Sequence, residues 1–325
     1  MGKQVKTIGV LTSGGDAPGM NAAIRAVVRT GISKGLNVVG VRRGYNGLIN
    51  GDLIDMSLRS VSDIIHRGGT MLYTARCEEF RHESGLQKAT QTCIDHGIDG
   101  VVVIGGDGSF RGARDLSLRG IPCVGIPGTI DNDIACTDYT IGYDTAMNTA
   151  MEMIDKCRDT AQSHDRCLVV EVMGRRCGDI ALNTGIACGA TTIVVPEVPF
   201  DMQKDCLERI QKDLTRGKRH FIIIVAEGYG KVEEIAKQVE DFTGITGRAL
   251  VLGHVQRGGN PSVRDRVIAS QMGHYAIEKL LCNGIGNRVI ALKHDQIVDF
   301  DILEALEQKK KFNMDLYRIA HEISI

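Results

Sequence analysis

Short apolar runs alternate with helical patterns along almost the whole chain. The apolar runs have the length of β-strands and fall at residues 6–11, 37–42, 100–104, 122–126, 167–172, 192–195, 220–226, 249–252 and 288–292. Helical spacing of the apolar residues lies between most of them, at residues 19–33, 86–96, 144–160, 204–215, 232–242 and 264–281. This alternation predicts an α/β protein with mainly parallel, doubly wound sheets. Ligands of such sheets bind at the carboxyl ends of the strands.

Three of the apolar runs end in a glycine-containing turn that is followed by acids. The segments are IGVLTSGGD at residues 8–16, VVVIGGDGS at residues 101–109 and VGIPGTIDND at residues 124–133. Glycines leave backbone N–H groups open to a bulky anion, and a helix N-terminus attracts negative charge. Carboxylates beside a phosphate require a metal ion or a proton transfer. Together these features predict phosphoryl transfer.

The first turn has the glycine spacing of a P-loop but not its chemistry. Gly14 and Gly19 are correctly separated, whereas Met20 and Asn21 stand where a P-loop requires Lys and Ser or Thr. The segment also lacks the G-x-G-x-x-G pattern of dinucleotide-binding folds. A tight strand–helix turn without a ligand is therefore an open interpretation of this segment.

The second and third turns carry the acids that are best placed for chemistry. Asp107 can hold Mg²⁺ and Ser109 can donate to a phosphate, although an aspartate here is also typical of a plain helix cap. In the third turn one carboxylate can take the proton of an attacking hydroxyl while another orients it or pairs with a cation. A loop of solvated acids is the alternative.

Arginines gather in short motifs outside these turns. A single arginine is usually part of a surface ion pair, but the guanidinium fork also binds phosphate bidentately. The motifs contain Arg76, Arg166, Arg175, Arg248 and Arg257, with His254 close to the last. Two phosphate-bearing substrates would account for several of them.

Length and composition fit a globular protein with room for two domains. Of the 325 residues, 39 are basic and 40 acidic, so a dedicated nucleic-acid-binding protein is not expected. The ten cysteines include no C-x-x-C pair and predict reduced thiols. The sequence opens without a signal arrangement, and its apolar runs are too short to span a membrane. We therefore expect a soluble, cytoplasmic protein.

Five motifs carry a resemblance to a known family. They are TSGGDAPGMNAAIR at residues 12–25, IGGDGS at 104–109, PGTIDND at 127–133, EVMGR at 171–175 and GHVQRGG at 253–259. In this order and spacing the chain resembles the bacterial ATP-dependent 6-phosphofructokinases from residue 6 to its end. The resemblance implies two doubly wound domains with the active site in the cleft between them. An ATP-binding domain would comprise residues 1–141 plus about 255–303, and a sugar-phosphate-binding domain residues 142–254 plus about 304–325.

The implied reaction is the Mg²⁺-dependent transfer of the γ-phosphoryl group of ATP to the 1-hydroxyl of fructose 6-phosphate, a step of glycolysis that yields fructose 1,6-bisphosphate and ADP. By resemblance the ATP site comprises Gly15, Arg76, Cys77, Gly106, Asp107, Gly108 and Ser109, with Asp107 on Mg²⁺. Asp131 would be the base, and Thr129, Arg175 and Arg76 would also be catalytic. The sugar phosphate would contact Thr129, Ile130, Asp131, Arg166, Met173, Gly174, Arg175, Glu227, Arg248, His254, Val255, Gln256 and Arg257.

The resemblance also implies an effector site and an oligomer. The effector positions are Arg25, Arg29, Arg158, Gly189, Arg216, Lys218, Arg219 and His220, and the implied effectors are of the ADP or phosphoenolpyruvate type. Two positions depart from the family: Leu58 stands where many members have a basic residue, and Thr191 where they have an acid. In the family Arg166 and Arg248 reach in from a neighbouring subunit, so the implied assembly is a homotetramer.

Three alternatives can be weighed from the motifs. Pyrophosphate-dependent members have an aspartate at the position of Gly108 and a lysine at that of Gly128, so the two glycines favour ATP. Kinases of the NAD or diacylglycerol type share the GGDG turn but lack the motifs at residues 127–133 and 253–259. A catalytically inactive sugar-phosphate or nucleotide sensor would typically have lost Asp107 or Asp131, and both are present.

Overall fold

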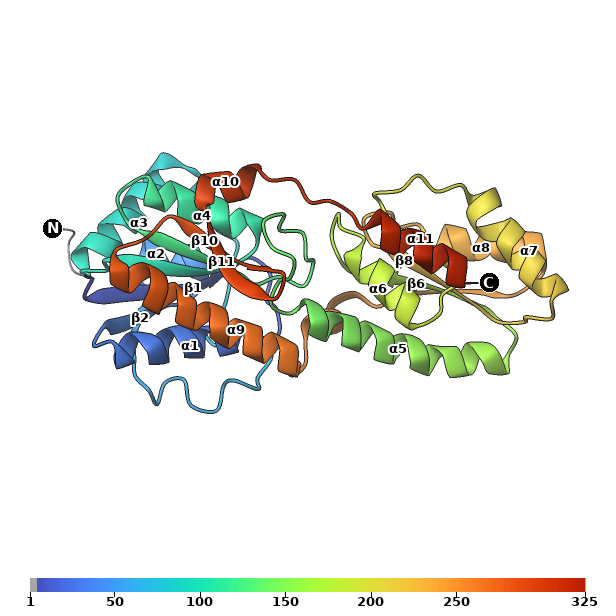
Figure 1. The fold of residues 1–325 in the computed structure, drawn as a ribbon, viewed down its shortest axis with the longest axis horizontal. Helices are drawn as coiled ribbons and strands as arrows, with labels where there is room; N and C mark the ends of the chain where they lie inside the picture. Colours follow the sequence, from blue (N-terminus) through green and yellow to red (C-terminus); the bar gives the residue numbers. More distant parts are fainter. Residues whose placement is uncertain (1–4, 325) are drawn as a thin grey trace. The chain divides into compact units, whose positions relative to one another are not determined.

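The computed structural model describes residues 5–324, which form two compact units (Figure 1). Unit 1 consists of residues 5–130, 134–145 and 257–310. Unit 2 consists of residues 131–133, 146–256 and 311–324. The chain therefore leaves unit 1 for the first time directly after Ile130, inside the third glycine turn.

Unit 1 is built on a seven-stranded sheet. Its strands are β1 (Thr7–Ser13), β2 (Asn37–Val41), β3 (Leu53–Met56), β4 (Gly100–Gly105), β5 (Cys123–Pro127), β10 (Arg288–Lys293) and β11 (Gln296–Asp301). The spatial order is β11-β10-β5-β4-β1-β2-β3, and only the two edge strands, β3 and β11, run antiparallel to their neighbours. From β1 the chain goes to β2 on one side and later returns to β4 on the other, so β1 and β4 flank the topological switch point of the sheet.

Helices cover both faces of this sheet. They are α1 (Met20–Ser33), α2 (Gly44–Asn50), α3 (Glu83–Asp95), α4 (Asp107–Ser117), α9 (Val263–Tyr275) and α10 (Ile302–Glu307), with the short turns η1 (Glu79–Arg81), η4 (Ala276–Leu280) and η5 (Leu281–Asn283). Alternate strand residues such as Leu11, Val101 and Val103 pack into one core with side chains of α2, α3, α4 and α10. On the other face α1 lies so close that a Cβ on Gly31 would meet Val38 at 2.8 Å. Because successive side chains of a strand point to opposite faces of the sheet, each buried strand contributes to the cores on both faces.

Unit 2 has a smaller, wholly parallel sheet. Its strands are β6 (Cys167–Val172), β7 (Thr192–Val194), β8 (Phe221–Ala226) and β9 (Gly247–Val251), in the order β7-β8-β6-β9. The other elements are α6 (Asp179–Ala187), η2 (Met202–Leu207), α7 (Glu208–Thr215), α8 (Val232–Thr243), η3 (Gly253–Arg257) and α11 (Met314–Ile323). Helix α5 (Tyr143–Ser163) begins in unit 1 and continues in unit 2. Phe221, Ile223 and Val225 form a core with η2, α7 and α8.

The structure confirms the predicted α/β class with mainly parallel sheets. All nine predicted strands are present, with bounds that differ by at most two residues, because most of them are buried and give continuous apolar runs; β9 is the exception, since most of its residues are exposed. The antiparallel strands β3 and β11 were not predicted, since their residues are largely half-exposed and show no such run. The helical pattern at 264–281 contains α9 followed by the wider turn η4, which hydrophobic spacing does not distinguish.

All ten cysteines are free thiols, as predicted. Most are buried, and burial raises the pKa of the Cys123 thiol to about 12. These residues pack as small apolar side chains.

Candidate active site

The three glycine turns lie side by side at the carboxyl edge of the unit 1 sheet. The parallel register pairs Ser13 of β1 with Gly105 of β4, and Gly105 with Pro127 of β5. Hydrogen bonds join the turns further: the Ser109 hydroxyl donates to the Ser13 carbonyl (3.0 Å), and the Gly128 N–H donates to the Gly105 carbonyl (3.0 Å). The three turns therefore meet at the carboxyl edge, where ligands of such sheets are expected, and at the switch point of this sheet.

Gly105 is the residue around which the turns close. A Cβ at this position would lie 2.4 Å from the Ser13 carbonyl oxygen and 2.5 Å from the Ser109 hydroxyl. At Gly108, by contrast, a Cβ would meet no atom within 4 Å. The first glycine is required by packing, whereas the space beside Gly108 is open. Ser109 is buried and its hydroxyl joins the first two turns, a role that spacing alone did not reveal.

The first turn also contacts two segments that are distant in sequence. The Thr74 hydroxyl donates to the Gly14 carbonyl (2.7 Å), which brings the segment carrying the exposed Arg76 to this turn. A guanidinium N–H of Arg257 donates to the Asp16 carbonyl (3.2 Å), and a Cβ on Gly15 would lie 2.7 Å from Arg257 Nη1. Gly15 was predicted for ATP and Arg257 for the sugar phosphate, and the structure places them in contact.

Asp107, the predicted magnesium ligand, is the first residue of α4. Its side chain is 41% exposed and forms a salt bridge with Arg111 one helical turn further on, with 2.9 Å between Oδ2 and Nε. Among the described residues, no group of three or more His, Cys, Asp or Glu side chains could hold a metal ion. Asp107 is therefore a single accessible carboxylate at a helix N-terminus.

The third turn is buried, unlike a loop of solvated acids. Asp131 is only 6% exposed and Asn132, which has a φ of +50°, only 3%. The Thr140 hydroxyl donates to the Thr129 carbonyl (2.6 Å), and the Asn132 side-chain amide donates to Asp179 Oδ2 (2.9 Å). The turn carrying Thr129, Ile130 and Asp131 is thus held by hydrogen bonds on both sides of the Ile130–Asp131 bond.

In unit 2 the EVMGR motif forms a turn at the carboxyl end of β6. Gly174 has a φ of +140° and Arg175 a φ of +58°, so the chain reverses sharply there. The Glu227 carboxylate, at the end of the neighbouring strand β8, accepts from the N–H of Gly174 (3.1 Å) and from that of Arg175. Arg175 itself is 68% exposed and lies 3.7 Å from Asp133. Burial, together with the Glu227 and Glu233 carboxylates, raises the pKa of Glu171 in the same motif.

Gln256 supports this turn from the GHVQRGG motif. It is fully buried, its Oε1 accepts from the Met173 N–H (3.2 Å), and its Nε2 donates to the Gly253 carbonyl (3.1 Å). Both ends of the amide are therefore engaged with backbone. The same motif leaves Val255 53% exposed.

Arg166 and Arg248 lie at the other end of the unit 2 sheet. Arg166 directly precedes β6, and Arg248 pairs in register with Leu168 near the start of that strand. Strands rise by roughly 3.3 Å per residue, which separates these arginines from the Met173–Arg175 turn by about 20 Å along the sheet. A single copy of unit 2 thus does not bring Arg166 and Arg248 to the edge that carries Arg175 and Glu227.

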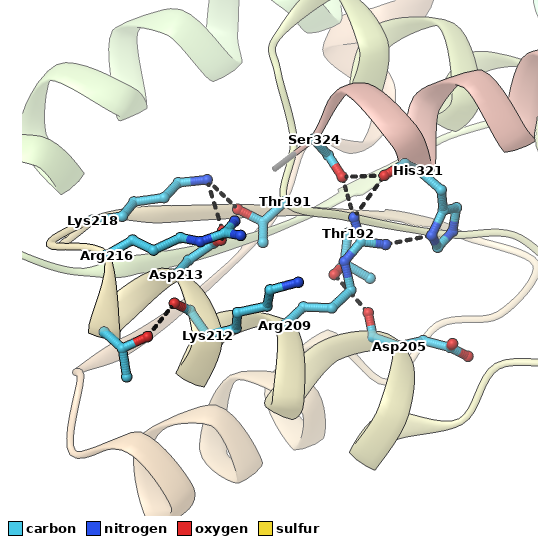
Figure 2. Close-up of polar contacts among 11 residues, drawn as sticks. Thr191, Thr192, Asp205, Arg209, Lys212, Asp213, Arg216, Lys218, His321 and Ser324 are labelled. Atoms are coloured by element: carbon cyan, nitrogen blue, oxygen red, sulfur yellow. Dashed lines mark hydrogen bonds and ion pairs between the residues drawn. The ribbon is translucent and has the colours of Figure 1, made fainter.

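Six of the predicted effector positions belong to unit 2. Lys218 Nζ donates to the Thr191 hydroxyl (3.2 Å) and pairs with Asp213 Oδ2 (3.3 Å), as Figure 2 shows. Arg216 also faces Asp213, at 3.9 Å. Arg158 donates to the Cys188 carbonyl, beside Gly189, whose φ is +59°. Of the remaining unit 2 positions, Arg219 is exposed and His220 is half-buried.

The other two effector positions, Arg25 and Arg29, lie one turn apart on α1 in unit 1. Burial and the neighbouring Arg29 lower the pKa of Arg25. Sequence reasoning missed Asp213, although it lies only a few residues before Lys218. Asp213 of α7 places a carboxylate 3.3 Å from Lys218, the residue that also donates to Thr191.

A second polar cluster in unit 2 joins α11 to α7. Arg209 of α7 donates to the His321 ring, to the His321 carbonyl (3.1 Å) and to the Ser324 hydroxyl, at the carboxyl end of α11 (Figure 2). A cation at this helix end satisfies carbonyl groups that have no partner within the helix. Burial and Arg209 lower the pKa of His321.

None of the helices in the described residues is both long and apolar enough to cross a membrane.

The fold and these turns define an α/β protein with three glycine turns at adjacent strand ends, the place where ligands of such sheets bind. The "Phosphofructokinase" family profile matches residues 7–280, and the chain belongs to this family. ATP-dependent 6-phosphofructokinases of Clostridium botulinum (strain Loch Maree / Type A3) and Clostridium tetani (strain Massachusetts / E88) are each 57% identical over 320 residues, which cover 98% of this chain and 100% of theirs. A solved phosphofructokinase from Saccharomyces cerevisiae is 37% identical with a TM-score of 0.87. The match covers 98% of this chain but only 48% of the yeast chain.

Proposed function

We propose that this chain is an ATP-dependent 6-phosphofructokinase, which transfers the γ-phosphoryl group of ATP to the 1-hydroxyl of fructose 6-phosphate. The observation that carries the proposal is the joining of the three glycine turns at adjacent strand ends, with the buried carboxylate of Asp131 directly after the third. The curated relatives of nearly equal length bear this activity in their names. In this function the chain acts in glycolysis, and we expect it in the cytoplasm.

The donor side of the reaction belongs to unit 1. The ATP phosphates lie against Gly15 and the Gly106–Ser109 turn, where the open space beside Gly108 admits them, and Arg76 and Cys77 complete this side. An aspartate at position 108 would put a negative charge where the nucleotide phosphates lie. This argues for ATP over pyrophosphate as the donor.

Asp107 fits a Mg²⁺ ion that comes with the nucleotide. Magnesium is usually held by one or two carboxylates together with substrate phosphates and water. The ion pair between Asp107 and Arg111 is a surface pair worth at most about 1 kcal/mol, so a divalent cation can replace it. When bound, Mg²⁺ neutralises negative charge on the ATP phosphates.

Asp131 accepts the proton of the attacking 1-hydroxyl. Its low exposure limits competition from bulk water for the proton. Asp131 follows Thr129 by two residues, so it is close along the chain to the turn that is joined to Gly105. Thr129 and Ile130 position the reacting end of the sugar. The exposed guanidinium of Arg175 is available to stabilise charge on the transferring phosphoryl group, as is Arg76.

The sugar phosphate is bound by unit 2 and by a neighbouring subunit. In unit 2 the Met173–Arg175 turn, Glu227 and the residues His254 to Gln256 form one part of the site, and Arg257, the next residue along the chain, belongs to unit 1. Because Arg166 and Arg248 lie at the opposite end of the unit 2 sheet, they serve the site of an adjacent chain, which fits a homotetramer. The six effector positions of unit 2 bind ADP or a phosphoenolpyruvate-like ligand, and the resemblance assigns Arg25 and Arg29 of unit 1 to the same kind of ligand.

The proposal is tested by the release of ADP from Mg-ATP with and without fructose 6-phosphate. We expect release only with the sugar phosphate, and negligible turnover with pyrophosphate as the donor. Asp131→Asn should lower kcat by about 10²–10⁴-fold and change substrate affinity by less than about tenfold, because it removes the base and keeps the shape.

Asp95→Asn, at the exposed end of α3, is the matched control and should retain wild-type activity. Near-normal kcat in Asp131→Asn would overturn the assignment of the base. Binding of fructose 6-phosphate without any ADP release would indicate the inactive sensor instead.

A further inference from the structure

Asp265 is a fully buried carboxylate to which the proposed reaction gives no role. It is 0% exposed and lies in the first turn of α9. Its carboxylate accepts from the Tyr139 hydroxyl (2.5 Å), the Gly142 N–H (2.7 Å), and both the N–H (2.9 Å) and hydroxyl (2.5 Å) of Thr145. All of these groups belong to unit 1.

The position of Asp265 explains how this buried carboxylate is stabilised. It occupies the first turn of α9, which Ser262 caps by accepting from the Asp265 N–H (3.2 Å), and it also receives an N–H from the first turn of α5. Helix N-termini carry partial positive charge and N–H groups that lack a partner within the helix. Two helix ends therefore share one carboxylate.

The segment that Asp265 holds is itself bonded to the third glycine turn. Within residues 139–142, the Thr140 hydroxyl donates to the Thr129 carbonyl (2.6 Å) and the Ile141 N–H donates to the Pro127 carbonyl (2.9 Å). Tyr139 and Gly142, at the two ends of this segment, are the residues bonded to Asp265. The third glycine turn, which carries Asp131 and is called the catalytic turn from here on, is thus fixed to β4 on one side. On the other side residues 139–142 link it to Asp265.

Asp265 acts in the same way on the segment that precedes it. The Ser262 N–H donates to the Thr145 hydroxyl (2.9 Å), which is itself bonded to Asp265. This fixes the chain just after the GHVQRGG motif, whose Arg257 contacts the first glycine turn. One carboxylate therefore links the segments that present Thr129 and Arg257.

We infer that Asp265 is a positioning residue for phosphoryl transfer, which holds the catalytic turn in place through residues 139–142. The inference rests on the proposed function for its kinetic consequence. Its structural consequence, the fixing of residues 127–142, can be measured without activity.

The test compares Asp265→Asn with Asp299→Asn. Asparagine at 265 directs an amide donor at groups that already donate, so the network loses at least one hydrogen bond. Asp299 is a matched control because it also accepts from a tyrosine hydroxyl in unit 1 (Tyr275, 2.8 Å) but is bonded to Arg288 and not to the turn. We expect Asp265→Asn to lower kcat about 10–100-fold with the KM for ATP changed less than about threefold. Asp299→Asn should lower thermal stability and leave kcat unchanged.

A double-mutant cycle separates positioning from general destabilisation. Thr140→Val removes the hydroxyl that bonds Thr129 and should lower kcat about 3–10-fold. In the double variant with Asp265→Asn, the loss of kcat should be no greater than with Asp265→Asn alone, because both act along one path. Losses that multiply would overturn the inference, as would equal kcat in Asp265→Asn and Asp299→Asn.

Amide hydrogen exchange gives a readout that does not need catalysis. Asp265→Asn should speed exchange at the Ile141 and Gly142 N–H groups, whereas Asp299→Asn should not. If the wild type shows no kinase activity but this difference is present, the proposed function fails and the structural link stands. If Asp265→Asn does not fold, Tyr139→Phe, which removes one donor and keeps the carboxylate, should show the same pattern at about 3–10-fold in kcat. Unchanged kcat and unchanged exchange in Tyr139→Phe would contradict the inference.

Discussion

The turns at the carboxyl edge of the unit 1 sheet are joined by backbone and buried side chains, whereas several cations that we assign to ligands in unit 2 are reached by solvent. In unit 1, Gly105 closes the turns by packing, and the Ser109 hydroxyl and the Asp265 carboxylate are buried where they link segments. In unit 2, Arg175 is 68% exposed and Lys218 is a half-exposed member of an ion pair. Buried contacts fix geometry, and exposed charges respond to ligands, salt and pH.

This difference separates the expected effects of mutation. Changes in unit 1 should alter the stability of the fold and the rate of the chemical step, because they move the turns. Changes among the exposed cations of unit 2 should alter the affinity for sugar phosphate or effector, with little effect on folding. The following experiments sharpen or break this separation.

Among these four experiments the largest effect is expected from Arg166→Ser in unit 2. Loss of a charge-assisted phosphate contact should raise the half-saturating fructose 6-phosphate by roughly 10–100-fold, or about 1.5–3 kcal/mol, with stability unchanged. Co-refolding Arg166→Ser chains with Asp131→Asn chains should restore part of the activity, because a hybrid can assemble one complete site. Verified hybrid oligomers without recovered activity would show that each chain uses its own Arg166.

Gly105→Ala tests the packed edge of unit 1. The added Cβ would lie 2.4 Å from the Ser13 carbonyl oxygen, so the turns must separate, and we expect a loss of about 1–3 kcal/mol in the free energy of unfolding. Gly108→Ala is the control, since its Cβ meets no atom within 4 Å and should not destabilise the fold. Urea unfolding measures both, and equal stability of the two variants would contradict the packing argument.

Thr191→Glu tests the charge balance at the predicted effector site. Thr191 is 1% exposed and its hydroxyl accepts from Lys218, which already pairs with Asp213. A second acid should widen the difference between the responses to ADP and phosphoenolpyruvate by about 1–2 kcal/mol of coupling, read as shifts in half-saturating fructose 6-phosphate. Thr191→Val removes the hydroxyl without adding charge and should not produce this widening. If the Thr191→Glu responses match those of wild type, position 191 does not set effector preference.

The smallest effect is a pH dependence at His321. Because burial and Arg209 lower its pKa below 6.5, folding favours the neutral ring. The contribution of His321 to stability is therefore present above about pH 6.5 and lost as the pH falls through the lower folded pKa. Wild type should lose more stability than His321→Gln between pH 7.5 and 5.5, by less than about 1 kcal/mol after solvent screening. Identical pH profiles of unfolding in the two proteins would contradict the assignment of this pH dependence to His321.

Much of unit 1 could be predicted because its signals are local. Buried parallel strands give continuous apolar runs, and the glycine turns follow them directly in the sequence. The edge strands β3 and β11 give weaker signals, since their residues are mostly half-exposed. Asp265 lay hidden within a helical pattern, although Ser262 followed by an acid three residues later is a capping signal.

The contacts that complete the site could not be predicted from spacing. Thr74 and Arg257 reach the first glycine turn from segments 60 and 241 residues away in sequence, and Thr140 bonds back to the third turn across 11 residues, so only the fold brings these contacts together. Gln256 was assigned to the substrate by resemblance, yet both ends of its amide are engaged with backbone. Its role in binding remains a prediction that these contacts do not test.

The separation of Arg166 and Arg248 from the Met173–Arg175 turn has a consequence for the amount of enzyme in a cell. If Arg166 and Arg248 complete the site of a neighbouring chain, as proposed, that site exists only in the assembled state, and specific activity should fall when the protein is diluted below the dissociation constant of the oligomer. The sugar phosphate then binds assembled chains in preference to dissociated ones, and by mass action it draws dissociated chains back into the oligomer. The concentrations of fructose 6-phosphate and of the protein would thus together set the fraction of assembled, active chains.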